Sequence, residues 1–254
     1  MTKHRLDQLL VQRGLAENRA RAQALILAGQ VFSGERRLDK PGQGVSAEIP
    51  LELRGQASPY VSRGGIKLAH GLDHFGIDPA GMVALDVGAS TGGFTDVLLR
   101  RGAARVYAVD VGHGQLDWRL RNDPKTVVLE RTNARHLNHD LIPEPVDLVV
   151  ADVSFISLKI ALPAALELTR PGACLVALIK PQFEVGKGQV GKGGVVRDTA
   201  LHERVCADIA RWLEHDQRWH VFALIESPIT GPRGNREFLI AGHRSRGDLQ
   251  SAPG

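Results

Sequence analysis

The chain has little cysteine and no long apolar run. Its two cysteines, Cys174 and Cys206, lie far apart in apolar segments. Their spacing fits no metal or redox motif, so we expect two small core residues of a reduced, cytoplasmic protein. The longest uninterrupted apolar run, residues 173–179, is much shorter than the roughly 20 residues that cross a bilayer. No transmembrane segment is predicted.

Other features are also missing. The N-terminus, MTKHRLDQLL, is charged and has no apolar signal region. The ten histidines are scattered without metal-ligand spacing, so no metal site is predicted. Neither sign of charge dominates strongly, because a net charge of +4 and a pI of about 9.3 only hint at an anionic partner. The 254 residues, 43% of them hydrophobic, favour one large soluble domain with a smaller one beside it.

The best-defined stretch is residues 82–110, MVALDVGASTGGFTDVLLRRGAARVYAVD. It is typical of a buried strand, a glycine-rich turn, a helix and a second strand that ends on Asp110. Gly88, Gly92 and Gly93 free the backbone for a tight turn. Such a turn presents amide groups at a helix N-terminus, and a carboxylate at the second strand end can bind a ribose diol. The stretch therefore predicts half of a nucleotide-type cofactor site.

The residues of this turn favour one cofactor over another. A dinucleotide motif would have glycine where this chain has Ser90, and Asp86 would repel a pyrophosphate. S-adenosylmethionine has an adenosine and a cationic sulfonium but no phosphate, so it fits better. The alternative is a packing turn that holds no cofactor. The predicted cofactor-binding residues are Asp86, Gly88, Ala89, Ser90, Thr91, Gly92, Gly93, Phe94, Asp110, Val111, Asn133 and Asp152.

Residues 1–58 are predicted to form a separate module. Two short helices are expected, the second capped by Asn18. A Ser33-Gly34 turn and a half-exposed strand over residues 47–54 are expected to follow. Basic side chains outnumber acidic ones in this module. An RNA-facing surface and an ordinary solvated basic face both remain open on charge alone.

The rest of the chain alternates strands with helices. A linker over residues 59–66 is expected to contain a Gly64-Gly65 hinge. A second, larger domain is predicted over 67–245, and residues 246–254 are predicted to form a disordered tail. This alternation predicts an α/β, Rossmann-like sheet of seven strands. The last connection is too short for a helical crossover, so the seventh strand should run antiparallel. Beyond residue 110, strands are expected at 127–129, 147–150, 173–179, 220–225 and 236–241, and helices at 156–168 and 199–214.

Charged residues gather where these strands end. Asp86, Asp110, Asp152 and Lys180 each fall at or near the carboxyl end of a strand, which is where open α/β sheets place their function. Structural ion pairs are common at such positions and are the alternative for each residue taken singly. Their convergence favours a reactive site.

Several motifs resemble one known family. RGGIKL, LDVGASTGGFTD, VYAVDVG, ERTNAR, ADVSFIS, LIKPQFE and GPRGNREFLI occur in this order, behind a segment that resembles the S-four RNA-binding fold. Together they resemble the TlyA family of ribosomal RNA 2′-O-methyltransferases, which belongs to the FtsJ-like class. The resemblance covers about residues 3–243. It implies S-adenosylmethionine as cofactor and cytidine in ribosomal RNA as substrate. Some members have also been labelled haemolysins.

The resemblance also implies residue roles. The family's catalytic tetrad carries over onto Lys67, Asp152, Lys180 and Glu237. In chemical terms, Lys180 would stabilise the alkoxide that forms on a ribose 2′-hydroxyl, while the carboxylates hold the two lysines. No metal is required. The S-four-like segment, which has Asn18 where a serine is common, implies RNA contacts. The predicted RNA-binding residues are Arg5, Arg19, Arg21, Lys40, Arg63, Lys187 and Lys192.

Lys187 and Lys192 lie in the loop EVGKGQVGKGG, which nearly matches a phosphate-binding motif. Gly193 stands where that motif needs a hydroxyl, so ATP hydrolysis is not expected. A lid that touches the RNA backbone and a plain flexible loop are both open.

Two other functions compete with the enzyme. One is a non-catalytic RNA-binding or ribosome assembly factor that keeps the methyltransferase fold, against which the intact tetrad argues. The other is a membrane-lytic protein, for which the chain has no apolar span and no strongly amphipathic cationic helix. Methyl transfer from labelled cofactor would discriminate between them.

Overall fold

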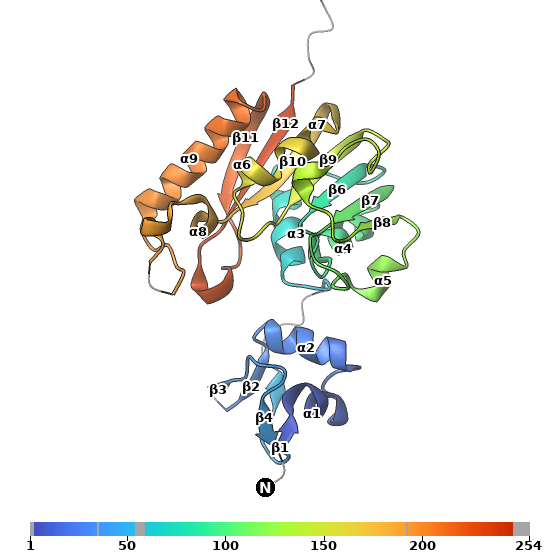
Figure 1. The fold of residues 1–254 in the computed structure, drawn as a ribbon, viewed down its shortest axis with the longest axis vertical. Coiled ribbons are helices and arrows are strands. Elements are labelled where there is room, and N and C mark those ends of the chain that lie inside the picture. Colours follow the sequence, from blue (N-terminus) through green and yellow to red (C-terminus); the bar gives the residue numbers. More distant parts are fainter. Residues whose placement is uncertain (1–2, 35, 54–58, 192, 246–254) are drawn as a thin grey trace, which may run out of the picture. The chain divides into compact units, whose positions relative to one another are not determined.

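The structure is a computed structural model that describes residues 3–34, 36–53, 59–191 and 193–245. The chain divides into two compact units, Met1–Arg63 and Gly64–Gly254 (Figure 1). The predicted linker at 59–66 falls across this division. Its Gly64-Gly65 pair is not a hinge, because both residues lie in the first turn of helix α3 (Gly64–Phe75).

The first unit packs two helices, α1 (Leu6–Gln12) and α2 (Arg19–Leu27), over small β-elements. As predicted, Asn18 caps α2, because its side chain accepts a hydrogen bond from the Arg21 amide at 2.9 Å. Leucine, isoleucine and valine side chains from both helices form a separate small core. The strands are β1 (Lys3–Arg5), β2 (Val31–Ser33), β3 (Arg36–Arg37), β4 (Gly44–Ser46) and β5 (Glu52–Leu53).

The strand predicted over residues 47–54 is mostly absent. Only Glu52–Leu53 pairs with β2, and Arg54 lies outside the described residues. Pro50 lacks an amide hydrogen and interrupts the ladder just before β5. Ile49 and Leu51 still pack partly buried against the small core. The alternation thus predicted the partial burial of Ile49 and Leu51, whereas Leu53 is exposed and the strand is limited to β5.

The second unit is built on a seven-stranded sheet, in the order β11-β12-β10-β9-β6-β7-β8. Strand β12 pairs antiparallel with both β10 and β11, and the remaining pairs from β10 to β8 are parallel. The predicted antiparallel seventh strand is confirmed. The strands are β6 (Val83–Val87), β7 (Arg105–Val109), β8 (Thr126–Leu129), β9 (Val146–Ala151), β10 (Thr169–Ile179), β11 (Trp219–Glu226) and β12 (Phe238–Arg244).

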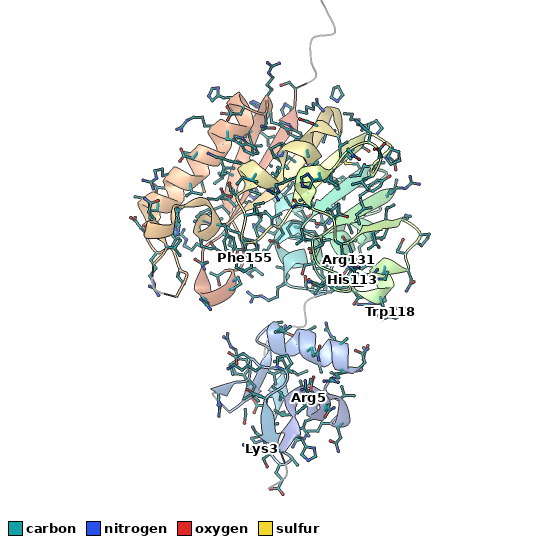
Figure 2. All side chains as sticks on the ribbon, viewed as in Figure 1. Lys3, Arg5, His113, Trp118, Arg131 and Phe155 are labelled. Atoms are coloured by element: carbon teal, nitrogen blue, oxygen red, sulfur yellow. The ribbon has the colours of Figure 1, made fainter. Side chains whose placement is uncertain are left out.

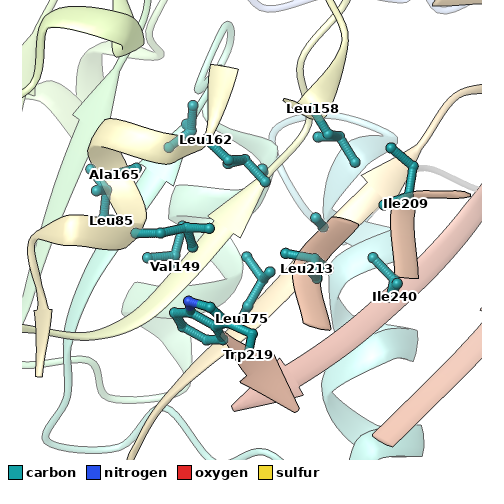
Figure 3. Packing of buried hydrophobic residues seen from close by; sticks show 14 of the residues in the cluster. Leu85, Val149, Leu158, Leu162, Ala165, Leu175, Ile209, Leu213, Trp219 and Ile240 are labelled. Atoms are coloured by element: carbon teal, nitrogen blue, oxygen red, sulfur yellow. The ribbon is translucent and has the colours of Figure 1, made fainter. Parts of the chain in front are cut away.

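Helices cover both faces of this sheet. On one face, Leu158, Ile209 and Leu213 pack against Leu175 and Ile240 of the strands (Figure 3). On the other face, α3 lies so close that a Cβ added at Gly71 would meet Leu239 at 3.3 Å. The remaining helices are α4 (Gly93–Arg100), α5 (Trp118–Arg121), α6 (Leu158–Ala161), α7 (Pro163–Glu167), α8 (Pro181–Glu184) and α9 (Thr199–His215), with 3-10 turns η1 (Ala134–His136), η2 (Lys187–Gln189) and η3 (Pro232–Gly234).

Two predicted boundaries are wrong in this unit. The helix expected over 156–168 is divided into α6 and α7, because Pro163 cannot donate to the preceding turn. Strand β10 begins at Thr169 instead of 173, and it includes Pro171 and Gly172. These two residues fall within a register shift against β9, between Thr169 and Cys174. A bulge lets the strand continue through residues that normally end one.

In the part of the chain that the structure describes, no helix combines the length and the apolar character needed to cross a bilayer. Of the two cysteines, Cys206 is buried and Cys174 is half-buried, and both are free thiols. Burial raises the pKa of the Cys206 thiol to about 12, so this thiol stays protonated and unreactive near neutral pH.

Candidate active site

Four strand ends meet at one edge of the sheet. The register pairs Ile179 with Phe238, so Lys180 and Glu237 come at the next position of β10 and β12. Ala151 pairs with both Ala177 of β10 and Val87 of β6. Asp152 therefore follows β9 between the ends of β10 and β6, and its amide donates to the Val87 carbonyl at 3.0 Å. The sheet itself brings three members of the predicted tetrad to the glycine-rich turn.

Lys180 and Asp152 form one ion pair at this edge. The Lys180 ammonium lies 2.6 Å from Asp152 Oδ1 and donates a hydrogen bond to Ser154 Oγ at 2.7 Å. The contact with Oδ1 is electrostatic and does not have the alignment of a hydrogen bond. The side chain of Lys180 is 10% exposed and that of Asp152 is 21% exposed, so one side of the pair faces solvent. The ammonium is thus held but still reachable.

Lys67 and Glu237 form a second ion pair. Lys67 Nζ, on α3, donates to Glu237 Oε2 at 2.5 Å, and both side chains are buried. Glu237 Oε1 is buried and has no hydrogen-bond partner in the described residues. A carboxylate this enclosed is stable only because the ammonium compensates its charge. Its second oxygen is enclosed as well, so this pair offers no open contact to a bound group.

Gly231 makes room for this second pair. A Cβ built on Gly231 would lie 1.9 Å from Glu237 Oε1, far inside van der Waals contact. The backbone of Gly231 has φ −74°, which any residue can adopt, so the requirement for glycine is purely steric. The sequence gives no sign of it beyond the motif GPRGNREFLI.

The glycine-rich turn packs directly against the tetrad. A Cβ at Gly88 would meet the Asp152 carbonyl oxygen at 2.8 Å, and Gly88 has φ +87°. Gly92, at the N-cap of α4 with φ +96°, lies against Leu116 and Leu120. No side chain caps the N-terminus of α4. The turn therefore presents a helix N-terminus beside Asp152, as a cofactor site of this class requires.

Asp110 organises the same turn from the end of β7. Its Oδ2 accepts from the Ser90 amide at 2.8 Å, and its Oδ1 accepts from the Gly112 amide at 2.7 Å. A carboxylate has about four acceptor positions, so two remain for a ribose diol. Asp110 is half-buried at the surface of the site.

Asp86 is the most deeply buried carboxylate near the turn. Its Oδ2 accepts from Thr95 Oγ1 at 2.7 Å, whereas Oδ1 is enclosed without a partner among the residues described. Burial raises the pKa of Asp86 to about 7. A cationic ligand nearby would offset the cost of ionising it. The orphaned oxygen, the uncapped helix and Asp110 together fit S-adenosylmethionine.

The comparisons with known proteins agree with this geometry. Residues 60–244 match the sequence model of the FtsJ-like methyltransferase family, and residues 4–48 match the model of the S4 domain. The chain belongs to the FtsJ-like methyltransferase family.

Individual relatives indicate a more specific group within this family. The chain is 51% identical to the 16S/23S rRNA (cytidine-2′-O)-methyltransferase TlyA of Mycobacterium tuberculosis, over 93% of this chain and 88% of that protein. It is 40% identical to Hemolysin A of Brachyspira hyodysenteriae, over 92% and 98% of the two chains. A solved structure of a protein proposed to be a hemolysin, from Streptococcus thermophilus, is 42% identical with a TM-score of 0.75, covering 96% and 90%. The predicted resemblance to the TlyA family is confirmed.

The other predicted cofactor residues have mixed environments in this FtsJ-like unit. Ser90, Thr91 and Val111 are exposed, whereas Ala89 and Phe94 are buried. Gly93 begins α4, and Asn133 caps η1 by accepting from the Arg135 amide at 3.1 Å. His113 binds Glu130 at 2.9 Å and is mostly exposed. These assignments stay predictions.

The predicted RNA-binding residues are spread over several environments. Arg5 and Arg19 both bind Asp7, Arg21 is half-buried on α2, and Lys40 is exposed. Arg63 is exposed at the end of the first unit. Lys187 lies in η2, but its side chain is not among those described, and Lys192 lies outside the described residues.

Sequence reasoning missed three residues at the catalytic edge. Ser154 binds Lys180, Thr95 binds Asp86, and Phe155 is 90% exposed with φ +66°. Phe155 lies with Arg131 and His113 along the same edge (Figure 2). The motif ADVSFIS contained the signal for two of them, because Ser154 and Phe155 stand two and three positions after Asp152.

Proposed function

We propose that this chain transfers a methyl group from S-adenosylmethionine to the ribose 2′-hydroxyl of a cytidine in ribosomal RNA. The observation that carries the proposal is the pair of lysine–carboxylate ion pairs at the carboxyl edge of the sheet, next to a glycine turn that fits the cofactor. The name of the 51% identical relative supports the substrate, and the S4 match at residues 4–48 supports an RNA partner.

The roles of the residues follow from their contacts. A ribose hydroxyl is a poor nucleophile at neutral pH, so its proton must leave as the new oxygen–carbon bond forms. The Lys180 ammonium, fixed by Asp152 and Ser154, would stabilise the negative charge that develops on that oxygen. S-adenosylmethionine, when bound, supplies a methyl group already activated by its sulfonium. Alignment is therefore most of what the protein adds.

The second pair has a positioning role. Lys67 is locked onto Glu237, and Glu237 is enclosed by Gly231. The register of β10 and β12 places the buried Glu237 carboxylate beside Lys180, and this carboxylate holds the Lys67 ammonium. Phe155, almost fully exposed beside Ser154, offers a ring on which a base can stack.

The cofactor is assigned to the turn between Asp86 and Asp110. The orphaned Asp86 oxygen and the uncapped α4 support this assignment. Residues 1–58 are assigned to RNA binding and residues 67–245 to methyl transfer.

Separated ribosomal subunits test the proposal. The purified chain is incubated with each subunit and methyl-labelled S-adenosylmethionine, and the RNA is then digested to nucleosides. We expect label in 2′-O-methylcytidine from at least one subunit. Label confined to bases, or none on either subunit at stoichiometric enzyme, would overturn the proposal and favour a non-catalytic assembly factor.

A further inference from the structure

The first unit contains a carboxylate that is completely buried and heavily hydrogen-bonded. Asp7, in the first turn of α1, has no solvent exposure. Its Oδ1 accepts from Arg5 Nε at 3.1 Å and from the Gln8 amide at 2.9 Å. Its Oδ2 accepts from Arg5 Nη2 at 3.0 Å, from Arg19 Nε at 2.9 Å and from Gln23 Nε2 at 3.0 Å. One carboxylate therefore joins β1 and α1 to α2.

The two arginines bound to Asp7 are not buried with it. The side chains of Arg5 and Arg19 are 46% and 52% exposed. Arg5 uses Nε and Nη2 on Asp7, and Arg19 uses Nε only, so each guanidinium keeps N–H donors that Asp7 does not use. Two cations share a single anion, which leaves positive charge at the surface of the unit.

A nearby loop extends this surface. The Leu6 amide donates to Gln43 at 3.0 Å, and the Asp7 amide donates to Pro41 at 3.0 Å, so the loop that carries exposed Lys40 is fastened to the start of α1. Gly42 lies under Arg5, because a Cβ there would meet Arg5 Nη1 at 3.3 Å. The guanidinium of Arg5 is thus fixed from both sides.

We propose that Asp7 is a positioning residue that holds Arg5 and Arg19 as a preformed clamp for a backbone phosphate of the RNA substrate. The inference rests on the proposed function, since it specifies how the first unit would bind the RNA. Free arginine side chains lose rotamer freedom when they bind a phosphate, and a clamp that is already ordered avoids most of that loss. The planar guanidinium donors then meet phosphate oxygens in a fixed geometry.

A simple charge argument predicts the opposite effect of removing Asp7. Loss of one negative charge from a phosphate-binding surface should strengthen RNA binding. The clamp requires the same loss to weaken it, because both arginines lose their fixed orientation. The sign of the change therefore separates the two accounts.

The experiment measures the affinity of the full chain for separated ribosomal subunits at fixed salt. Asp7→Asn keeps the shape of the side chain and removes its charge, and Asp39→Asn removes a charge from an exposed neighbour of Lys40. We expect Asp7→Asn to bind about tenfold more weakly, and Asp39→Asn to bind as tightly as wild type or more tightly. Circular dichroism and thermal unfolding confirm that each variant is folded. A folded Asp7→Asn that binds as tightly as wild type overturns the clamp.

Arg19→Lys gives a second test that leaves Asp7 in place. It keeps the positive charge but removes the planar fork, so we expect an affinity loss close to that of Arg19→Ala. An affinity equal to wild type would show that only charge matters and would also overturn the clamp. Failure of the clamp is distinct from failure of the proposed function. The clamp is tested by the affinities of the variants for ribosomal subunits, whereas the proposed function is tested by methyl transfer from the wild-type chain, so either can fail while the other holds.

Discussion

At the scale of single residues, the carboxyl edge of the sheet depends on two glycines that leave room for closely packed neighbours. Glu237 Oε1 occupies the space that a side chain at Gly231 would need, and Gly88 lies against the Asp152 carbonyl. A side chain at either position would displace the neighbouring Glu237 carboxylate or Asp152 backbone. Glycines at such positions are therefore expected to affect catalysis although they supply no reactive group, because small displacements of positioned groups lower the rate.

Gly231→Ala should damage catalysis without unfolding the second unit. The added methyl group displaces the Glu237 carboxylate, and Lys67 loses its 2.5 Å partner. We expect the turnover number to fall by roughly a hundredfold while cofactor affinity changes little. Gly186→Ala is the matched control, because a Cβ at Gly186 meets nothing within 4 Å. Equal turnover of the two variants would show that the Lys67–Glu237 pair is dispensable.

Asp86→Asn should change how stability depends on pH. Burial raises the pKa of Asp86 from 3.8 to about 7, so the folded chain binds the proton more tightly than the unfolded chain. The stability gained from this proton is complete below about pH 4 and is lost as the pH rises through about 7. Asparagine cannot ionise, and it still accepts from Thr95. Melting temperatures of the cofactor-free protein should therefore favour the variant over wild type progressively from pH 5 to pH 8; a constant difference would contradict the assignment.

At the scale of elements, two loops beside the tetrad are fastened together by one buried side chain. Asn235 accepts from the Val196 amide at 3.2 Å and donates to Gly194 at 3.0 Å and to Pro232 at 3.2 Å. It thereby ties the end of the loop EVGKGQVGKGG, for which a lid and a plain surface loop are both open, to the turn that precedes Glu237. In the residues described around it, this loop is anchored at its C-terminal side.

Asn235→Ala should release that anchor. The buried Val196 amide would lose its partner, which costs about 1–3 kcal/mol of unfolding free energy. Hydrogen exchange in residues 193–197 should accelerate, while exchange in β6 and β9 stays slow. Unchanged exchange at the Val196 amide would mean that the loop is held by other contacts.

The elements also show where sequence reasoning works. Contiguous apolar runs such as residues 173–179 predicted their strands, because a strand covered on both faces is apolar on both faces. The short connection before Phe238 predicted the antiparallel strand for a geometric reason. The wrong boundaries both lie at prolines. Pro163 divides α6 from α7, and Pro171 lies in a bulge of β10 that depends on pairing with β9.

The positions of the candidate site residues could also be predicted from the sequence, but their contacts could not. Residues at strand ends were found, since strand ends converge whatever the details of packing. The contacts that fix them were not. Asp7 and Gly231 act through neighbours distant in the chain, such as Gln23 on a second helix, and no local pattern reports such a pairing.

At the scale of the whole molecule, the chain divides between Arg63 and Gly64 into two units, to which we assign RNA recognition and methyl transfer respectively. Each unit has its own apolar core. We therefore expect the second unit to fold without the first.

Deletion of residues 1–58 should leave the second unit folded and able to bind S-adenosylmethionine, but it should weaken binding to ribosomal subunits. The affinity of wild type should fall as salt rises, with a slope set by the number of phosphates neutralised, and the truncated chain should show a shallower slope. Calorimetry and filter binding measure the two affinities. Equal affinity and slope would place RNA recognition outside the first unit.

The central claim is that Lys180 acts on the reacting oxygen, and Lys180→Ala tests it most directly. The variant is compared with Lys125→Ala, which removes an exposed lysine, for methyl transfer to purified ribosomal subunits. We expect Lys180→Ala to lower the turnover number roughly a hundredfold or more, with cofactor and RNA affinities close to wild type. Lys180→Arg should rescue poorly, because its planar group does not fit between Asp152 and Ser154. Methyl transfer by Lys180→Ala at the wild-type rate would make this lysine a structural partner of Asp152 and contradict the account.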